Sequence, residues 1–429
     1  MKKIFLLLSL TLFILSFTHI LFNLLQILPK KNFIDFFVYN GAVEKFLNQQ
    51  NPYNFLYGQP PDKIPFNYPP SALLVLLPLK LFPMKITQII LVILSFLAFW
   101  STFWVILKMS RIKISLPHFL ILLAFLNQTF PVKFTLVLGQ INLIVLGLAY
   151  GGLYLYFKSY KKLIGGAGAC LPDRQGRAPD DAQFFTSIGG RETRDRIYQF
   201  FSIVFFSLAS SLKIFPLFTL PLFIILKDFK FVFSVVGIFL ALNLLPSLNL
   251  FKQYYFQIVP NLNNAVGIPN FYDQSLLAFL LRLGVDVSVA KIVLLLFLST
   301  VFVLVFFRFY RSKNKATTSN VAGAIKQCNN VTIKLFSLVF ALFSIGGLFS
   351  WQHHLVFAYP LIFIVYLKTL ERQKNLKAKL FYNFLFLFVW LVFVFHFKTE
   401  TSPYLLNPLV ASYQTITVLF FIVYSLLRS

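Results

Sequence analysis

Asp35 is the carboxylate with the clearest potential for chemistry in this sequence. It lies in NFIDFFVYNGAVEKF, residues 32–46, where most neighbours are apolar, in a chain with 13 Asp plus Glu against 39 Lys plus Arg. Apolar surroundings raise the pKa of a carboxyl toward neutrality, which suits a general base. The alternative is a carboxylate stabilised by the helix dipole, with Asn32 as a competing cap. Glu44 is nine residues further on and points to the opposite helix face, so the two acids form no dyad.

Lys213 is the second candidate, because the stretch SLKIFPLF places it inside an otherwise apolar run. A lysine in such a run is costly unless it pairs with an anion or reaches the membrane interface. A phosphate-bearing lipid headgroup is one natural partner. The alternative interpretation is simple snorkelling of the side chain to the interface.

The stretch GLFSWQHHLVF gathers Trp351, Gln352, His353 and His354. Adjacent histidines point about 100° apart on a helix, so they are poor joint ligands for one metal ion, and the HExxH spacing is absent. These side chains better suit hydrogen bonds to phosphate or sugar, with Trp351 available to stack on a sugar face. The alternative is an aromatic belt at the membrane interface with polar companions.

Two further stretches supply polar side chains. DQSLLAFLLRL contains Asp273, Gln274 and Arg282, and Arg282 lies one or two turns into an apolar helix. There it could bind a phosphate, pair with Asp273 or snorkel. LGQINLIVLG contributes Gln140 and Asn142, and such buried amides more often hydrogen-bond neighbouring helices than contact a substrate.

The elements that must position these residues are membrane helices. The chain is 58% hydrophobic and 12% charged, against roughly 25% charged in a soluble domain. Several runs approach the ~20 apolar residues that cross a hydrocarbon core, so the sequence predicts an all-α, polytopic helical membrane protein. The net charge of +26 lies in short Lys and Arg clusters between apolar runs. This pattern indicates cytoplasmic loops beside a lipid bilayer and argues against a nucleic-acid partner.

The basic clusters predict the topology, because cytoplasmic loops are enriched in Lys and Arg. They lie at 108–113, 158–162, 227–230, 308–315 and 372–379. About twelve transmembrane helices place every cluster in the cytoplasm, with both termini cytoplasmic and the first apolar run retained as a span. The expected spans lie near 4–28, 86–107, 116–130, 132–157, 198–211, 214–227, 231–250, 288–308, 335–349, 351–368, 380–397 and 405–427.

The segments between these spans complete the organisation of a single membrane domain over residues 1–429. Residues 68–83 are short and rich in proline, which favours a partly embedded helix on the outer side over a further span. Polar segments at 29–70, 251–275 and 350–354 face outward and hold most candidate residues. The segment 165–196 has a different, polar composition and is predicted to be a flexible cytoplasmic loop or insertion.

Known cofactor signatures are missing from the sequence. It contains no GxGxxG, Walker or DxD motif, and Cys170 and Cys328 fall in predicted cytoplasmic loops, which excludes a disulfide framework. We therefore expect no cofactor. An enzyme acting at the outer face would need a donor carried on a membrane lipid, whose phosphate leaving group requires positive charge.

The order of several short motifs resembles glycosyltransferase family 87, over residues 30 to 365. They are Asp35, NPY at 51–53, FNYPP at 66–70, PL at 78–79, GQIN at 139–142, LKIFP at 212–216, DQSL at 273–276 and SWQHH at 350–354. Members of this family are multispanning enzymes with the GT-C fold. They include α-mannosyltransferases that use polyprenyl-phosphate-mannose, and related arabinofuranosyltransferases.

The resemblance implies roles for specific residues. The family's catalytic aspartate falls on Asp35, the lysine of its Lys-x-x-Pro motif on Lys213, and its Trp-x-His-His stretch on Trp351, His353 and His354. In such enzymes the aspartate deprotonates the acceptor hydroxyl, which displaces the lipid phosphate with inversion and without a metal ion. Two features depart from the family pattern: NQQNPY lacks the glycine often found before NPY, and the 165–196 segment has no counterpart.

We therefore expect a hexosyltransferase of the cell membrane, with its active site on the outer face. Its donor would be a polyprenyl-phosphate-linked sugar, such as mannose, and its acceptor a glycolipid or envelope glycan. The expected donor-phosphate ligands are Lys213, His353, His354 and Arg282. The expected sugar or acceptor ligands are Trp351, Gln352, Tyr53, Tyr68, Asp273 and Gln274.

A flippase or transporter of lipid-linked saccharides, without transferase chemistry, is the competing hypothesis. Transport would place essential charges near the bilayer midplane, usually at the interface of structural repeats. Here the informative residues gather at one predicted face, and no internal repeat is visible.

Overall fold

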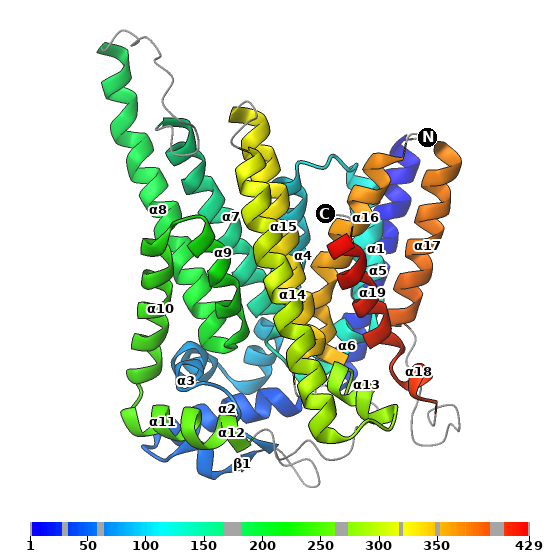
Figure 1. Cartoon of the computed structure of the whole chain (residues 1–429). Coiled ribbons are helices and arrows are strands. Elements are labelled where there is room, and N and C mark those ends of the chain that lie inside the picture. The colour runs from blue at the N-terminus through cyan, green and yellow to red at the C-terminus, as the bar shows by residue number, and fades with distance from the viewer. Residues whose placement is uncertain are drawn as a thin grey trace.

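The computed structural model describes residues 2–27, 33–57, 64–166, 182–261, 273–316, 321–347, 352–373, 375–394 and 407–427. Nearly all of these residues are helical, which confirms the all-α prediction (Figure 1). The strands β1 and β2 form one short antiparallel pair in which Leu56 faces Pro65.

In the element labels, η marks a 3-10 helix, except that η5 is a π-helical turn. In chain order they are α1 (Lys2–Ile27), α2 (Ile34–Leu47), η2 (Pro52–Asn54), β1 (Leu56–Tyr57), β2 (Ile64–Pro65), α3 (Pro70–Leu76), η3 (Leu77–Lys80), α4 (Met84–Ser110), α5 (Leu116–Gln128), α6 (Phe130–Leu138), α7 (Asn142–Gly166), α8 (Ala182–Leu212), η4 (Phe215–Thr219), α9 (Leu220–Ile225), α10 (Phe229–Leu244), α11 (Leu248–Gln253), η5 (Tyr254–Ile258), α12 (Val259–Asn261), α13 (Leu276–Arg282), α14 (Val287–Ala316), α15 (Val321–Gly346), η7 (Gln352–Ala358), α16 (Tyr359–Arg372), α17 (Leu376–Val394), α18 (Pro408–Ala411) and α19 (Tyr413–Leu427).

Within the described residues, 5 helices are long and apolar enough to cross a membrane. They are Lys3–Leu24, Met84–Ser110, Val287–Arg311, Gln352–Arg372 and Lys377–Val394. Two bent pairs raise the number to 7 if each pair is one span: α5 with α6, bent by 61°, and the pair Phe229–Leu244 and Leu248–Asn261, bent by 107°. The protein is therefore a helical membrane protein, and the expectation of about twelve spans is not confirmed.

The difference in span count has local causes. Proline lies in the first turn of α6, of η4 and of α9, and a proline stabilises a helix start but not a helix interior. The expected single span over 132–157 is divided between α6 and α7, because Gly139 takes a left-handed φ of 69°. Residues 70–80 form a short apolar helix, well below the ~20 residues that cross a bilayer.

The 165–196 segment also differs from expectation. The helix α7 extends to Gly166, and α8 begins at Ala182. Residues 182–196, expected within a flexible loop, are therefore helical. Residues 167–181 lie outside the described part of the chain.

The short elements gather at one end of the long helices (Figure 1). The helices α2, α3, α11 and α12 and the strand β1 lie at the lower left of that view, and α13 and α18 lie at the lower right. The N and C marks lie toward the opposite end of the bundle.

The helix α2 packs against the rest of the protein along one face. Its residues Phe36, Val38, Tyr39, Ala42 and Val43 are buried. They belong to the main hydrophobic core, together with residues of α3, α4, α6 and α7. From the sequence, an apolar stripe on this segment predicts an outer-loop helix lying in the membrane interface; the stripe consists of Phe33, Phe36, Phe37, Val43, Phe46 and Leu47. In the structure Phe33, Phe36 and Val43 of this stripe are buried in the core, whereas Leu47 is exposed.

Close helix packing depends on Gly147 of α7. A Cβ atom there would lie 2.5 Å from the Cβ and 2.8 Å from the carbonyl oxygen of Ala98 on α4. Small residues let membrane helices approach closely, which is how such helices gain packing energy without a hydrophobic driving force. The backbone of α4 lies in the way of any larger side chain at this position.

Gly147→Ala should therefore destabilise the protein by about 1–3 kcal/mol, because the added methyl forces α4 and α7 apart. Gly237→Ala is the matched control, since Gly237 is also helical and a Cβ there meets nothing within 4 Å. Thermal unfolding of both variants in detergent measures the effect. Equal stability of the two variants would contradict the close approach of α4 and α7.

Candidate active site

Asp35 lies in the first turn of α2 and is only 9% exposed. The residue at the N-cap position of α2 is Phe33, which makes no side-chain cap hydrogen bond. Asn32, the competing cap considered from the sequence, lies outside the described residues. Glu44, on the same helix, is exposed and pairs with Lys80 at 2.8 Å, as expected for a solvated face.

The burial of Asp35 changes its acidity. Desolvation raises the pKa of its carboxyl from 3.8 to about 6, although a hydrogen bond from Gln140 and the positive charge of Lys213 both lower the pKa. Burial dominates because it disfavours the charged form more than the two partners favour it. The carboxyl is therefore able to take up a proton near neutral pH.

Gln140 connects Asp35 to two tyrosines. Its side-chain oxygen Oε1 accepts hydrogen bonds from the hydroxyl groups of Tyr39 and Tyr68, each at 3.2 Å. The two hydroxyl oxygens also lie 2.7 Å apart. Because Oε1 accepts from the tyrosines, the amide N–H groups of Gln140 are the part that can donate to the Asp35 carboxyl.

Gly139 brings Gln140 to this position. A Cβ at Gly139 would lie 2.7 Å from the ring of Phe33 and 2.8 Å from the Cβ of Phe36, which flank Asp35 on α2. The positive φ of 69° is a conformation that side-chain-bearing residues rarely adopt. The GQIN motif therefore lets the α6–α7 break contact the start of α2.

Lys213 follows the last residue of α8, and its backbone N–H donates to the carbonyl of Ala209 at 3.0 Å. Its ammonium Nζ lies 3.1 Å from Nε2 of His354. An ammonium group can only donate, so Nε2 is the acceptor and His354 carries any single proton on Nδ1. Burial lowers the pKa of Lys213 to about 8, while the negative charge of Asp35 raises it.

His353 adjoins His354, with ring centroids 4.4 Å apart. Its backbone carbonyl accepts hydrogen bonds from Thr135 of α6 and Asn142 of α7, each at 3.2 Å. The α6–α7 break thus holds the histidine pair on one side and Asp35 on the other. This arrangement brings residues from opposite ends of the sequence into one group.

Two residues beside the histidines complete this stretch. Gln352 is fully buried, and neither its side-chain oxygen nor its nitrogen has a hydrogen-bond partner among the described residues. Trp351 lies outside the described residues. Lys213, His354 and Tyr68 are partly exposed, whereas Asp35 and Gln140 are buried, so a ligand would reach the group past the partly exposed side chains.

Tyr53 supports this group from the NPY turn. Its hydroxyl donates to the backbone carbonyl of Tyr68 at 2.8 Å, and its ring stacks on Tyr254. Asn51 accepts from the backbone N–H of Tyr53 and donates to Gln253 of α11 at 2.6 Å. Tyr53 is thus a residue that positions Tyr68 and ties it to α11.

The predicted ligands Asp273, Gln274 and Arg282 lie elsewhere, near α13 and α18 at the other side of the same end (Figure 1). Arg282 donates to the hydroxyl of Ser412 at 2.8 Å and to the backbone carbonyl of Asp273 at 2.6 Å. The amide of Gln274 donates to the carbonyl of Ala411 at 2.8 Å. The described hydrogen bonds of Arg282 and Gln274 therefore tie α13 to the end of α18 and the residue before α19.

Sequence reasoning missed part of this site. Gln140 was expected to hydrogen-bond neighbouring helices, and it does bond Tyr39 of α2, but its interaction with Asp35 was not predicted and Tyr39 was not singled out. A signal for Tyr39 was present, since it lies four residues after Asp35 and so shares its helix face. No local sequence pattern predicts that Gln140 contacts both Asp35 and Tyr39, because this contact depends on the turn at Gly139.

Replacing Asp35 by Asn should stabilise the protein above pH 6. The folded-state pKa of about 6 exceeds the ordinary 3.8, so the folded protein binds more protons than the unfolded chain between these values. Stability therefore falls as the pH rises through this window, by about 3 kcal/mol in total. Asp35→Asn removes this loss of stability. The free energy of unfolding, measured from pH 4 to 8, should therefore fall less in the variant than in the wild type. A variant less stable than wild type at pH 8 would instead indicate a stabilising ion pair.

A comparison with protein-family models matched glycosyltransferase family 87 over residues 66–172 and 186–328. The interval between the two matches lies within the 165–196 segment. Tyr68, Gln140 and Lys213 fall within the matched stretches, whereas Asp35 and the histidine pair join them through the fold. Searches of curated proteins and of solved structures found no match. Because the matched stretches cover more than half of the chain, the protein belongs to glycosyltransferase family 87.

Proposed function

We propose that this glycosyltransferase transfers a hexose, with mannose as the first candidate, from a polyprenyl-phosphate donor to a glycolipid or envelope glycan. One observation carries the proposal. The buried carboxyl of Asp35, whose pKa lies near neutrality, interacts with the ammonium of Lys213, which in turn contacts His354. A base and a cationic group thus occur together, and transfer from a lipid phosphate requires both.

Asp35 is the proposed general base. Its carboxylate takes the proton of an acceptor hydroxyl while the acceptor oxygen forms a bond to the anomeric carbon of the donor sugar. The bond from that carbon to the phosphate oxygen breaks, and the polyprenyl phosphate leaves with the electron pair. Attack on the face opposite the leaving group inverts the anomeric configuration.

Lys213 and the histidines are the proposed phosphate-binding group. Negative charge grows on the bridging phosphate oxygen as its bond to the sugar breaks, so a fixed cation nearby stabilises the transition state. The contact of Lys213 with Nε2 of His354 directs the ammonium toward the histidine stretch. An imidazole N–H of His353 or His354 adds a neutral donor without adding a second buried charge.

Tyr53, Tyr68 and Gln352 are the proposed contacts for the sugar or the acceptor. Tyr68 is partly exposed and its hydroxyl belongs to the Gln140 network, so it can exchange a hydrogen bond with a sugar hydroxyl. Gln352 brings a buried amide whose side-chain atoms have no described partner. Trp351 would add a stacking surface, while Asp273 and Gln274 would contact an extended acceptor. Arg282, the further expected phosphate ligand, lies beside them and hydrogen-bonds Ser412 and the backbone carbonyl of Asp273.

The proposal places this chemistry at the outer face of the cell membrane. The Asp35 end of the bundle is the end away from the N and C marks (Figure 1), and the basic clusters of the sequence favour cytoplasmic termini. No group of three or more His, Cys, Asp or Glu that could hold a metal ion occurs among the described residues. Transfer without a metal ion stays a prediction, which added chelator tests directly.

Asp35→Asn should lower sugar transfer by roughly 100- to 10,000-fold, because general bases contribute about this much to a rate. Glu44→Gln is the matched control, since Glu44 is an exposed acid on the same helix and its loss should leave transfer unchanged. Transfer is measured with polyprenyl-phosphate-sugar donors in membranes, with mass analysis of the product. Full activity of Asp35→Asn would exclude the assigned base. Movement of saccharide across liposomes without a new glycosidic bond would favour the transport hypothesis.

The rate of transfer should depend on pH as a bell-shaped curve. Activity should rise as the pH passes about 6, where the Asp35 carboxyl loses its proton. It should fall as the pH passes about 8, where the Lys213 ammonium loses its proton. Lys213→Arg should remove the alkaline decline, because a guanidinium stays protonated. An alkaline decline that persists unchanged in Lys213→Arg would show that another group causes it.

A further inference from the structure

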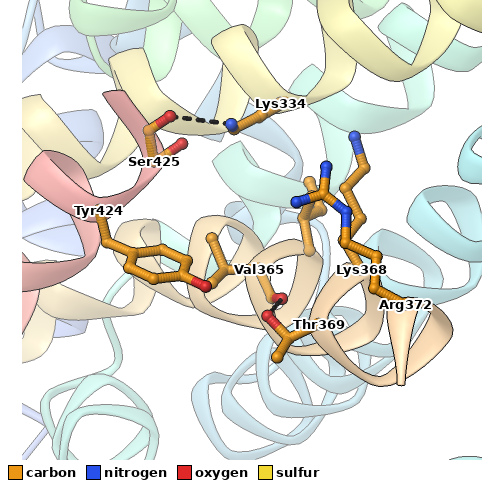
Figure 2. Close-up of a pocket in the computed structure, with 8 residues that line it drawn as sticks. Lys334, Val365, Lys368, Thr369, Arg372, Tyr424 and Ser425 are labelled. Carbon is orange, nitrogen blue, oxygen red and sulfur yellow. Dashed lines mark hydrogen bonds between the residues drawn. The ribbon is translucent and has the colours of Figure 1, made fainter. Parts of the chain in front are cut away.

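Four cationic side chains converge at the far end of α16, remote from Asp35. Lys334 of α15 interacts electrostatically with three other cations, namely Lys368 and Arg372 of α16 and Arg308 of α14. Figure 2 shows Lys334, Lys368 and Arg372 around one small pocket. From the histidine pair to Lys368 the chain runs through η7 and most of α16, about 20 Å of helix. This pocket is therefore separate from the candidate active site.

The convergence of these charges requires compensation. Lys334 and Lys368 are partly buried, and like charges held together in a membrane protein repel one another. Lys334 donates to the backbone carbonyl of Ser425 at 2.8 Å, and Lys368 lies 3.5 Å from the carbonyl of Asn330. These carbonyl contacts satisfy donors, but they do not neutralise charge. Glu371 is the acid that acts on Lys368, and it is exposed.

The pocket has the size for one oxygen of a larger anion. Its volume is about 30 Å³, and its wall also includes Thr369 and Tyr424. One water-sized group needs roughly 10–15 Å³, so a whole phosphate does not fit inside. A phosphate could place one oxygen between Lys334 and Lys368 while Arg372, which is exposed at the rim, contacts the others.

The surroundings favour a lipid over a dissolved ion. Phe307, beside Arg308 on α14, is 63% exposed, and Leu427, two residues after Ser425 on α19, is 77% exposed. Exposed apolar side chains at the ends of such helices are suited to contact with acyl chains. A phosphate that enters between these helices with apolar chains attached would cover them, whereas inorganic phosphate would leave them bare.

We propose that Lys334, Lys368 and Arg372 form a binding site for the phosphate of an anionic phospholipid, at the membrane face opposite the candidate active site. Basic pockets between transmembrane helices are a known form of headgroup recognition. The bound lipid would join α15, α16 and α19 at that face and stabilise their packing. This site is independent of the proposed sugar transfer.

The test compares the wild type with Lys334→Gln/Lys368→Gln in nanodiscs of phosphatidylcholine with and without phosphatidylglycerol. Phosphatidylglycerol should raise the unfolding temperature of the wild type, and the double variant should lose this increase. Native mass spectrometry should show lipid retention weakened at least roughly tenfold, as expected for the loss of one charge-assisted hydrogen bond. Lys377→Gln/Lys379→Gln, which removes two exposed lysines from the start of α17, is the control.

Arg372→Gln provides a second variant at an exposed position, in case the double variant does not fold. It too should weaken lipid retention. An equal loss of lipid retention in the α17 control would show that general surface charge, and not this site, retains the lipid. Undiminished retention in both pocket variants would overturn the site outright. Millimolar inorganic phosphate in pure phosphatidylcholine discs should leave the unfolding temperature unchanged, and an equal increase there would assign the pocket to a dissolved ion.

Discussion

The buried carboxyl of Asp35 is the constraint on which the candidate site depends. A carboxylate removed from water needs hydrogen bonds and positive charge nearby, or it takes up a proton. The protein supplies both in limited measure, through the amide of Gln140 and the charge of Lys213. The result is a carboxyl whose pKa is raised from 3.8 to about 6, so that it exchanges its proton near neutral pH.

The break between α6 and α7 contacts both the start of α2, which carries Asp35, and the stretch that carries the histidines. Gly139 allows the break to contact Phe33 and Phe36 beside Asp35, and Gln140 follows it directly. Asn142, two residues later, holds the backbone carbonyl of His353. A single reversal of the chain thus fixes the distance between the base on α2 and the histidines before α16, with Lys213 between them through His354.

The sequence singled out individual residues better than it predicted which residues contact them. Asp35 and Lys213 stood out because a charge among apolar residues is costly, and both lie in the site. Gln140 did not stand out, because a buried amide has no local sign of its partner. Arg282 stood out for the same reason as Lys213, yet its described partners are Ser412 and Asp273. The helical class was predictable from composition, whereas the span count was not, since prolines and Gly139 divide the apolar runs.

Infrared titration of the Asp35 carboxyl tests the central claim most directly. In the full-length protein, a carboxyl band should convert to carboxylate with a midpoint near pH 6 and should be absent in Asp35→Asn. A band assigned to Asp35 that converts near pH 4, as for an ordinary exposed acid, would contradict the account. In that case the carboxylate would be a structural charge, and the base for sugar transfer would have to be another group.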